Sequence, residues 1–443
     1  MQPAPKEDYE MKEDGGNVDS PLETNLRKLL NRRRKNSTLR NLTVNSNKID
    51  FSSNDFLSLS NNSALKKTYL EELRRVDLPI GSGGSRLLDG NSTYAENLEK
   101  EIASFHGAES GLLFNSGFDA NAGFFACVPQ IGDVVVYDEL IHASVHDGMR
   151  LSRAAKTVPF KHSCVQDLKT VLERVLKEER DAKGLQAGQA HVFIAVEAVY
   201  SMDGDVAPLQ SIVETVETIL PRGKGYIVVD EAHATGVLGS HGRGLVSQLG
   251  LERHIFARLH TFGKAMACNG AIILGSHILR HYLINYARPL IYSTFMSYPT
   301  LSAIRASYSL LKAGKTELLA SKLHFLIQYL FDQFNTVQRP SFRALLSLPH
   351  ECPQSPIFSI QLKEPKDLAR FLQERGMMVR AVVPPTVPIG TSRVRVCLHA
   401  GNTTEEIDLL LRAIEEWCAG RSGIIETNSH SQSKEEVIAR ARL

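Results

Sequence analysis

Lysines usually lie on solvated surfaces, but one lysine of this chain lies among small and apolar residues. It is Lys264, in the stretch HTFGKAMACNG (260–270). Burial lowers the pKa of a lysine, so that its neutral amine can attack a carbonyl carbon. Upstream, Asp230 closes the apolar run GYIVVD, and His233 follows three residues later. An amine, a carboxylate and an imidazole at one place could bind an aldehyde and move protons.

Pyridoxal 5'-phosphate uses this combination of groups. Its aldehyde forms a Schiff base with a lysine, an aspartate keeps its pyridine nitrogen protonated, and a His or Ser can hydrogen-bond its phenolic oxygen. Its phosphate is held by backbone N–H groups, best at a helix N-terminus. The segment NSGFDANAG (115–123), which follows the apolar run GLLF, predicts such a turn. Each feature alone has a structural alternative. Segment 115–123 could be an ordinary loop, and Asp230 could be a structural residue that accepts hydrogen bonds from loop N–H groups.

Other chemistries fit the motifs less well. DEAH at Asp230–His233 would suggest a helicase, but the sequence has no G-x-x-x-x-G-K-[ST] loop. The segment GVLGSHGRG lacks the G-x-G-x-x-G spacing of a dinucleotide-binding turn. His142 and His146 would share one helical face, yet no carboxylate is placed as a third metal ligand. The six cysteines are scattered without a C-x-x-C, which indicates reduced thiols in an intracellular protein.

The composition is that of an ordinary globular protein. A length of 443 residues suggests two or three closely associated domains. The net charge of +2 gives no electrostatic reason to expect a nucleic-acid partner. No apolar run has the length of a membrane-spanning helix, and the N-terminus has no apolar core of a secretory signal.

Strands and helices alternate along the middle of the chain. A helix is predicted over 92–105, with Ser92 as its N-cap. Continuous apolar runs are typical of parallel strands covered on both faces, so we expect a doubly wound α/β domain. In such a sheet functional groups collect at the carboxyl ends of strands, where Asp230 lies. The apolar runs predict strands at 111–114, 133–138, 191–199, 225–232 and 271–275.

The whole chain is predicted to have five parts. Residues 1–20 are expected to be disordered, and 21–75 to form a helix and strand segment that starts with a surface helix over 21–40. The large α/β domain would span 76–310. A strand-helix-strand-strand-helix pattern predicts a small α+β domain within 311–422, followed by a flexible tail over 423–443.

Seven segments resemble, in the same order, the motifs of one enzyme family. They are FSSNDFLSLS, GSGGSRLLDGN, LFNSGFDAN, VYSMDGDVAPL, VVDEAHATGVLGSHGRG, HTFGKA and PPTVPIGTSRVRV. The chain resembles the α-oxoamine synthases over about residues 25–420. These are fold-type I pyridoxal-phosphate enzymes, acyltransferases that condense an amino acid with an acyl-CoA. The resemblance implies a large mixed, mostly parallel sheet domain, a small α+β domain, and a homodimer with its active site at the subunit interface.

The resemblance also implies roles for individual residues. Lys264 would be the Schiff-base lysine and would move the proton at the substrate Cα. Asp230 would face the pyridine nitrogen, His233 the phenolic oxygen, and His142 would stack on the cofactor ring. Further implied contacts are Ser201 near the cofactor oxygen, Gly117, Phe118 and Thr261 at the phosphate, Thr294 at the partner's phosphate, and Arg40, Asn54 and Arg393 at the substrate. Arg32, Arg33 and Arg34 are alternatives to Arg40.

The implied substrates follow from one branch of the family. DEAHATGVLG, RPLIYSTFM and PPTVPIGTSRVRV are most similar to the biotin-pathway branch, which condenses L-alanine with pimeloyl-CoA. The alternatives are another amino acid or acyl-CoA, such as glycine or serine in secondary metabolism, or a catalytically inactive homologue that acts as a binding subunit. The C-terminal Ala441-Arg442-Leu443 resembles a signal for the peroxisomal import receptor, so we expect the peroxisome, with the cytoplasm as the alternative.

Overall fold

The computed structural model describes residues 20–36, 38–44, 47–181, 190–220, 223–336 and 345–421. The predicted disorder before residue 20, the tail over 423–443 and the C-terminal signal therefore lie outside the described residues. The chain forms two compact units, residues 1–47 and 48–443. In the first unit, helix α1 (Pro21–Lys35) begins with a capping box formed by Ser20 and Glu23, and none of its residues is buried. The predicted surface helix is thus confirmed, with its end at Lys35.

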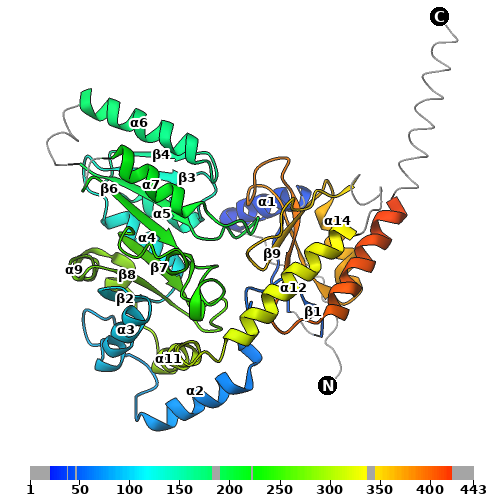
Figure 1. The fold of residues 1–443 in the computed structure, drawn as a ribbon, viewed down its shortest axis with the longest axis horizontal. Helices are drawn as coiled ribbons and strands as arrows, with labels where there is room; N and C mark the ends of the chain where they lie inside the picture. Colours follow the sequence, from blue (N-terminus) through cyan, green and yellow to red (C-terminus); the bar gives the residue numbers. More distant parts are fainter. Residues whose placement is uncertain are drawn as a thin grey trace, which may run out of the picture. The chain divides into compact units, whose positions relative to one another are not determined.

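The second unit is built on a large mixed sheet (Figure 1). Among the described residues it has seven strands in the order β2-β8-β7-β6-β5-β3-β4. Strand β8 is antiparallel to both of its neighbours, and the other neighbouring strands are parallel. The strands are β2 (Ser110–Phe114), β3 (Val134–Asp138), β4 (Lys156–Phe160), β5 (Val192–Glu197), β6 (Gly225–Asp230), β7 (Ala257–Thr261) and β8 (Ala271–Gly275). This sheet confirms the predicted fold class.

Helices cover both faces of this sheet, which explains the continuous apolar runs. Along β5, Ile194 lies in the cluster that includes helices α6 (Val165–Asp181) and α7 (Leu209–Ile219), and Phe193 lies in the cluster on the opposite face. Because side chains alternate between faces, every position of such a strand is buried. The opposite face carries α4 (Gly117–Cys127), α5 (Ala143–Arg150) and α9 (His277–Tyr286).

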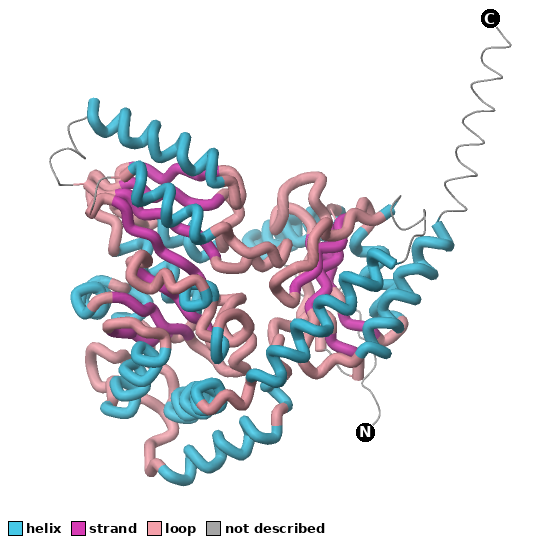
Figure 2. Tube along the Cα trace, viewed as in Figure 1, coloured by secondary structure: helices cyan, strands magenta, loops and turns pink. Residues whose placement is uncertain are grey.

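A smaller sheet forms near the C-terminus, and Figure 2 shows its strands as a second group. Strands β9 (Ile357–Gln361), β12 (Arg393–Cys397) and β11 (Arg380–Val382) are antiparallel in the order β11-β12-β9. Helix α14 (Pro365–Glu374) and a helix over 404–421 complete the predicted pattern of elements. Strand β1 (Ile49–Asp50) pairs in parallel with β10 (Met377–Met378), which joins the segment at residue 49 to this part of the chain.

The remaining helices connect these two sheets or pack against them. Helix α3 begins as predicted, because the Ser92 hydroxyl accepts a hydrogen bond from the backbone N–H of Ala95. The bounds are α2 (Ser63–Arg75), α3 (Thr93–Phe105), α8 (Leu245–Gln248), α10 (Arg288–Tyr292), α11 (Tyr298–Lys312) and α12 (Glu317–Thr336), with short 3₁₀ turns η1 (Leu59–Asn61) and η3 (Ser240–Gly242). No helix in the described ranges has the length and hydrophobicity to span a bilayer.

Two strands were not predicted. Strand β4 is an edge strand with alternating exposure and contains Pro159, so its sequence does not resemble a buried strand. Strand β7 is fully buried but contains Arg258 and His260. A guanidinium N–H of Arg258 donates to the His106 carbonyl at 2.9 Å, and Nδ1 of His260 lies 2.9 Å from the Thr235 hydroxyl. These two polar residues interrupt the apolar pattern by which a central strand is predicted.

Candidate active site

Polar residues lie at the carboxyl ends of three neighbouring strands. Glu197 ends β5, Asp230 ends β6 directly opposite it, and Thr261 ends β7. Lys264 follows Thr261 by three residues. The predicted placement of functional groups at this edge of the sheet is therefore observed for Asp230 and Lys264. Glu197 was not singled out from the sequence, although it also closes an apolar run.

Asp230 is fixed by hydrogen bonds from two directions. Its Oδ1 accepts from the backbone N–H of Ala232 at 2.9 Å, and its Oδ2 accepts from the side-chain amide of Asn121 at 2.8 Å. Asn121 lies on α4 and also donates to the Ser144 hydroxyl at 3.1 Å, which lies 2.8 Å from Nδ1 of His142. Asn121 thus connects Asp230 to His142. It was not named as a site residue, although it lies in the segment NSGFDANAG.

His233 is buried beside this group, and its Nδ1 has no hydrogen-bond partner among the described residues. Burial lowers the pKa of His233 well below its ordinary value, and the positive charges of Lys264 and Arg395 lower it further. The imidazole is therefore neutral at physiological pH. A buried polar atom without a partner is costly, so the site requires a group to bind this nitrogen.

Lys264 is half-buried, and its pKa is lowered from the ordinary value of a lysine. Burial is the main cause, with Asp230 and Glu197 opposing the shift and Arg395 adding to it. A lowered pKa increases the share of neutral amine near neutral pH. Lys264 thus has the electrostatic environment of a nucleophile.

His142 caps helix α5 and lies near the same group. Burial lowers the pKa of His142, with the charge of Asp230 opposing the shift. Its ring meets the exposed Phe118 ring edge to face, at 6.5 Å between centroids. His146 instead packs against Tyr137 at 5.2 Å, and no cluster of metal-ligating residues occurs in the part of the chain that the structure describes.

The N-terminus of α4 provides the expected turn. Helix α4 begins at Gly117, and the Ser116 hydroxyl caps it by accepting from the backbone N–H of Asp119. The first backbone N–H groups of a helix have no partner within the helix. A Cβ atom at Gly117 would lie 3.4 Å from the Thr261 hydroxyl, so these two residues are adjacent. The carbonyl of the exposed Thr294 accepts from the Asn115 amide at 2.8 Å.

The two arginines of β12 have different surroundings. Arg393 is buried, and its guanidinium pairs with Asp203. Arg395 donates from Nε to the Ser201 carbonyl at 2.6 Å and from Nη2 to Asn54 at 2.9 Å. Its charge also lowers the pKa of both His233 and Lys264. The structure thus brings Asn54, Ser201 and Arg395 to the site, whereas Arg393 was the residue expected there. Arg40 is an exposed residue of the first unit.

These features fit pyridoxal phosphate. A bound phenolic oxygen would supply the missing partner of His233, and the charged Asp230 would hold a proton on the ring nitrogen. The glycine at 117 leaves the N-terminus of α4 open beside the Thr261 hydroxyl, which suits a phosphate. Lys264, with its lowered pKa, would attach to the aldehyde.

Comparison with known proteins identifies relatives over almost the whole chain. Residues 46–414 match the model of the aminotransferase class I and II family. An 8-amino-7-oxononanoate synthase from Emericella nidulans is 53% identical over 407 residues, which cover 90% of this chain and 97% of the relative. The aminoacyl transferase sphA of Aspergillus fumigatus is 41% identical over 83% of this chain and 80% of its own length.

A solved structure shows the same architecture. The serine palmitoyltransferase of Sphingomonas wittichii superposes with a TM-score of 0.76 at 25% identity, over 91% of this chain and 100% of that one. The matched regions include the strand ends that carry Asp230 and Lys264. The chain therefore belongs to the aminotransferase class I and II family and, within it, to the α-oxoamine synthases, which are pyridoxal-phosphate-dependent acyltransferases.

Proposed function

We propose that the protein condenses L-alanine with pimeloyl-CoA and releases 8-amino-7-oxononanoate, coenzyme A and CO2, a step of biotin biosynthesis. The observation that carries this proposal is the 53% identity to the Emericella nidulans 8-amino-7-oxononanoate synthase, over 97% of that relative. An alignment that covers 90% of this chain spans both sheets and the strand ends of the site. The residues needed for the chemistry are present at those ends.

The side chains would divide the work as follows. The bound cofactor supplies a protonated ring that accepts the electrons left at the substrate Cα when its proton departs. The Lys264 amine is the base that removes this proton, because its pKa is lowered by burial. Asp230 keeps the ring nitrogen protonated, and Asn121 fixes the direction of its carboxylate. His233, neutral because it is buried, donates to the phenolic oxygen.

Arg395 is the proposed partner of the substrate carboxylate. Its guanidinium is fixed by the Ser201 carbonyl and the Asn54 amide oxygen, and its charge acts on Lys264. A guanidinium can bind a carboxylate through two parallel hydrogen bonds, which fixes orientation as well as position. Arg393 cannot do this while it pairs with Asp203 in a buried position. The assignment to Arg395 therefore replaces the one expected from the sequence.

The second candidate is another amino acid or acyl-CoA. It is favoured by the 41% identity to the aminoacyl transferase sphA and by the fold shared with serine palmitoyltransferase. An assay with alanine, glycine and serine, each crossed with pimeloyl-, succinyl- and palmitoyl-CoA, separates the candidates through the rate of coenzyme A release. We expect alanine with pimeloyl-CoA to give the highest kcat/KM. A higher value for serine with palmitoyl-CoA would replace the first proposal by the second.

The Lys264→Ala variant tests whether this site is the catalytic one. It should lose both turnover and the visible absorbance of cofactor attached to the protein, because no other described lysine lies at this strand end. If the variant kept both, the assignment of Lys264 would be wrong. A wild-type protein that is colourless in the presence of the cofactor would instead indicate a catalytically inactive binding subunit.

Assembly and location are also proposals. We infer a homodimer, with Thr294 directed to the phosphate of the partner subunit, and import into the peroxisome through Ala441-Arg442-Leu443, which lies outside the described residues. Mixing a Lys264→Ala subunit with a Thr294→Ala subunit should restore activity only if sites are shared across a dimer. Deletion of the last three residues should move a fluorescent fusion to the cytoplasm.

A further inference from the structure

The loop YSMDGD (200–205), which follows β5, is attached on one side to the small sheet. The Ser201 carbonyl accepts from Nε of Arg395 at 2.6 Å, and the Asp203 carboxylate pairs with the guanidinium of Arg393. Both arginines lie on β12. The position of loop 200–205 therefore determines where the Arg395 guanidinium is anchored.

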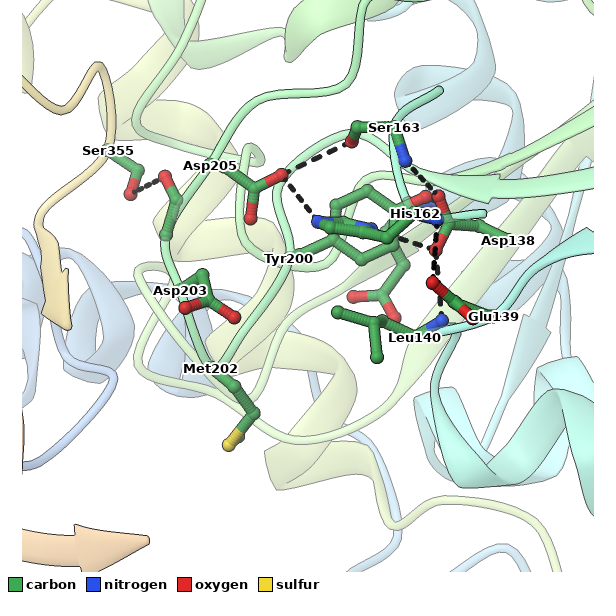
Figure 3. Close-up of polar contacts among 12 residues, drawn as sticks. Asp138, Glu139, Leu140, His162, Ser163, Tyr200, Met202, Asp203, Asp205 and Ser355 are labelled. Carbon is green, nitrogen blue, oxygen red and sulfur yellow. Dashed lines mark hydrogen bonds and ion pairs between the residues drawn. The ribbon is translucent and has the colours of Figure 1, made fainter. Parts of the chain in front are cut away.

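On its other side the loop is attached to His162 (Figure 3). Nε2 of His162 lies 2.9 Å from Oδ2 of Asp205, the last residue of the loop, and its Nδ1 lies 2.9 Å from Oδ1 of Asp138. Asp138 ends β3, and its carboxylate also accepts from the backbone N–H groups of Leu140 and Ser163. His162 is therefore a bridge between a strand end that is fixed in the sheet and a loop that is not part of it.

His162 is a cation in this arrangement. Carboxylates only accept hydrogen bonds, so both ring nitrogens carry protons, as they do only in the imidazolium form. Burial opposes this charge, but hydrogen bonds to Asp138 and Asp205 raise the pKa of His162 to about 10. The Tyr200 ring packs against the imidazole edge to face, at 4.5 Å between centroids. The bridge is thus charged throughout the physiological range.

We propose that His162 is a positioning residue for the substrate carboxylate, because it holds loop 200–205 against β3 and thereby fixes the Arg395 guanidinium through the Ser201 carbonyl. The inference rests on the proposed role of Arg395. Without the imidazolium, the carboxylates of Asp138 and Asp205 have no cation between them and repel each other. The loop then moves away from β3, and the anchor of Arg395 moves with it. Small displacements of a positioning group are costly for binding and turnover.

The test measures amino-acid binding apart from turnover, through the change in visible absorbance of the bound cofactor. The probes are L-alanine and L-alaninamide, which differ in the carboxylate that Arg395 would hold. For His162→Gln we expect about tenfold weaker binding of alanine, the scale of one charged hydrogen bond, and unchanged binding of alaninamide. The KM for alanine should rise by a similar factor, while the KM for pimeloyl-CoA stays the same.

Two comparisons make the result decisive. If Arg395→Gln keeps the preference for alanine over alaninamide, the proposed role of Arg395 fails. If Arg395→Gln loses that preference and His162→Gln keeps it, the positioning role of His162 is overturned. The matched control is His254→Gln, which removes another imidazole–carboxylate pair, 2.6 Å from His254 Nδ1 to Glu217 Oε1, at the opposite end of β7 from Thr261. This control should bind alanine as the wild type does.

A second variant covers the case in which His162→Gln does not bind the cofactor. Asp205→Asn keeps an acceptor oxygen for His162 but removes the charge from the loop. Alanine should then bind several-fold more weakly, in the same direction as for His162→Gln but by less. Alanine binding equal to that of the wild type would overturn the proposal.

Discussion

Glu197 and Asp230 lie opposite each other as the last residues of two neighbouring parallel strands. Both are buried. Burial, together with the charge of Asp230, raises the pKa of Glu197 well above its ordinary value and so favours its protonated form. Asp230 accepts hydrogen bonds from the Asn121 side-chain amide and the Ala232 backbone N–H, which fix its carboxylate in place. The two neighbouring carboxyl groups therefore have different surroundings, and those of Glu197 favour its protonated form.

Replacement of each residue by its amide should therefore have very different effects. Glu197→Gln resembles the protonated acid, so kcat should fall by less than about threefold. Asp230→Asn removes the charge opposite the ring nitrogen, so kcat should fall by about a thousandfold or more, the scale of a lost electrostatic stabilisation. Steady-state rates of coenzyme A release, at saturating alanine and pimeloyl-CoA, measure both. Equal losses in the two variants would contradict the assignment of charge to Asp230.

Asn121 should act through the residues that it holds. Asn121→Ala removes the donor to Asp230 and to the Ser144 hydroxyl that contacts His142. We expect kcat to fall by about 10- to 100-fold, as for other residues that orient a functional carboxylate. Asn121→Asp should be worse, because it places a second negative charge against Asp230. If Asn121→Asp were the more active of the two, the hydrogen bond to Asp230 would not matter for catalysis.

The sequence predicted the central sheet and the main chemical groups for a clear physical reason. Apolar runs predict buried parallel strands, and polar residues at their ends predict where Asp230, His233 and Lys264 meet. The choice between Arg393 and Arg395 could not be made in this way, because residues two apart on β12 share a face. Which of them reaches the site depends on loop 200–205. Asp203 of this loop pairs with Arg393, whereas the guanidinium of Arg395 donates to Asn54.

The stability of the protein should depend on His162 at alkaline pH. Its pKa is about 10 in the folded protein, above the ordinary value near 6.5, so its contribution is complete below pH 6.5 and is lost as the pH rises through about 10. The groups that face it are Asp138, Glu139, Tyr200 and Asp205. Burial raises the pKa of Tyr200 well above its ordinary value, so this phenol stays neutral over the same range.

Urea unfolding from pH 7 to pH 10.5 checks this expectation. The free energy of unfolding of the wild type should fall by roughly 3 kcal/mol more than that of His162→Gln. The difference between the two proteins should therefore narrow as the pH rises. If it stayed constant, or if it widened, His162 would not be a cation in the folded protein.

At acid pH a pair of buried histidines should control stability. The rings of His106 and His260 lie 4.0 Å apart in the core. Nδ1 of His106 lies 3.1 Å from the Arg243 carbonyl, which only accepts, so the proton is on Nδ1, and Nε2 accepts from the Tyr308 hydroxyl at 3.0 Å. Donation from the Tyr308 hydroxyl favours the neutral ring, while the Arg243 carbonyl fixes which nitrogen carries the proton.

His260 is also neutral, because burial disfavours its charged form. The Thr235 hydroxyl donates its one proton to the Glu231 carbonyl at 2.7 Å, so Nδ1 of His260 must donate to the Thr235 oxygen. In the neutral ring its Nε2 therefore carries no proton, and this nitrogen has no hydrogen-bond partner among the described residues. Burial lowers the pKa of His260 well below its ordinary value, and the charges of neighbouring His106 and Arg258 would add to the shift.

Acid should therefore unfold the protein partly through this pair. Burial, with the nearby charge of Arg258, lowers the pKa of His106 to about 3, below the ordinary value near 6.5. Its contribution to stability is present above pH 6.5 and is lost as the pH falls toward 3. Between pH 7 and pH 4 the free energy of unfolding of the wild type should fall by roughly 3 kcal/mol more than that of His106→Gln, measured by urea unfolding. The exposed His281, replaced by Gln, is the control and should follow the wild type. Parallel curves for His106→Gln and the wild type would show that protonation of His106 does not contribute to acid unfolding.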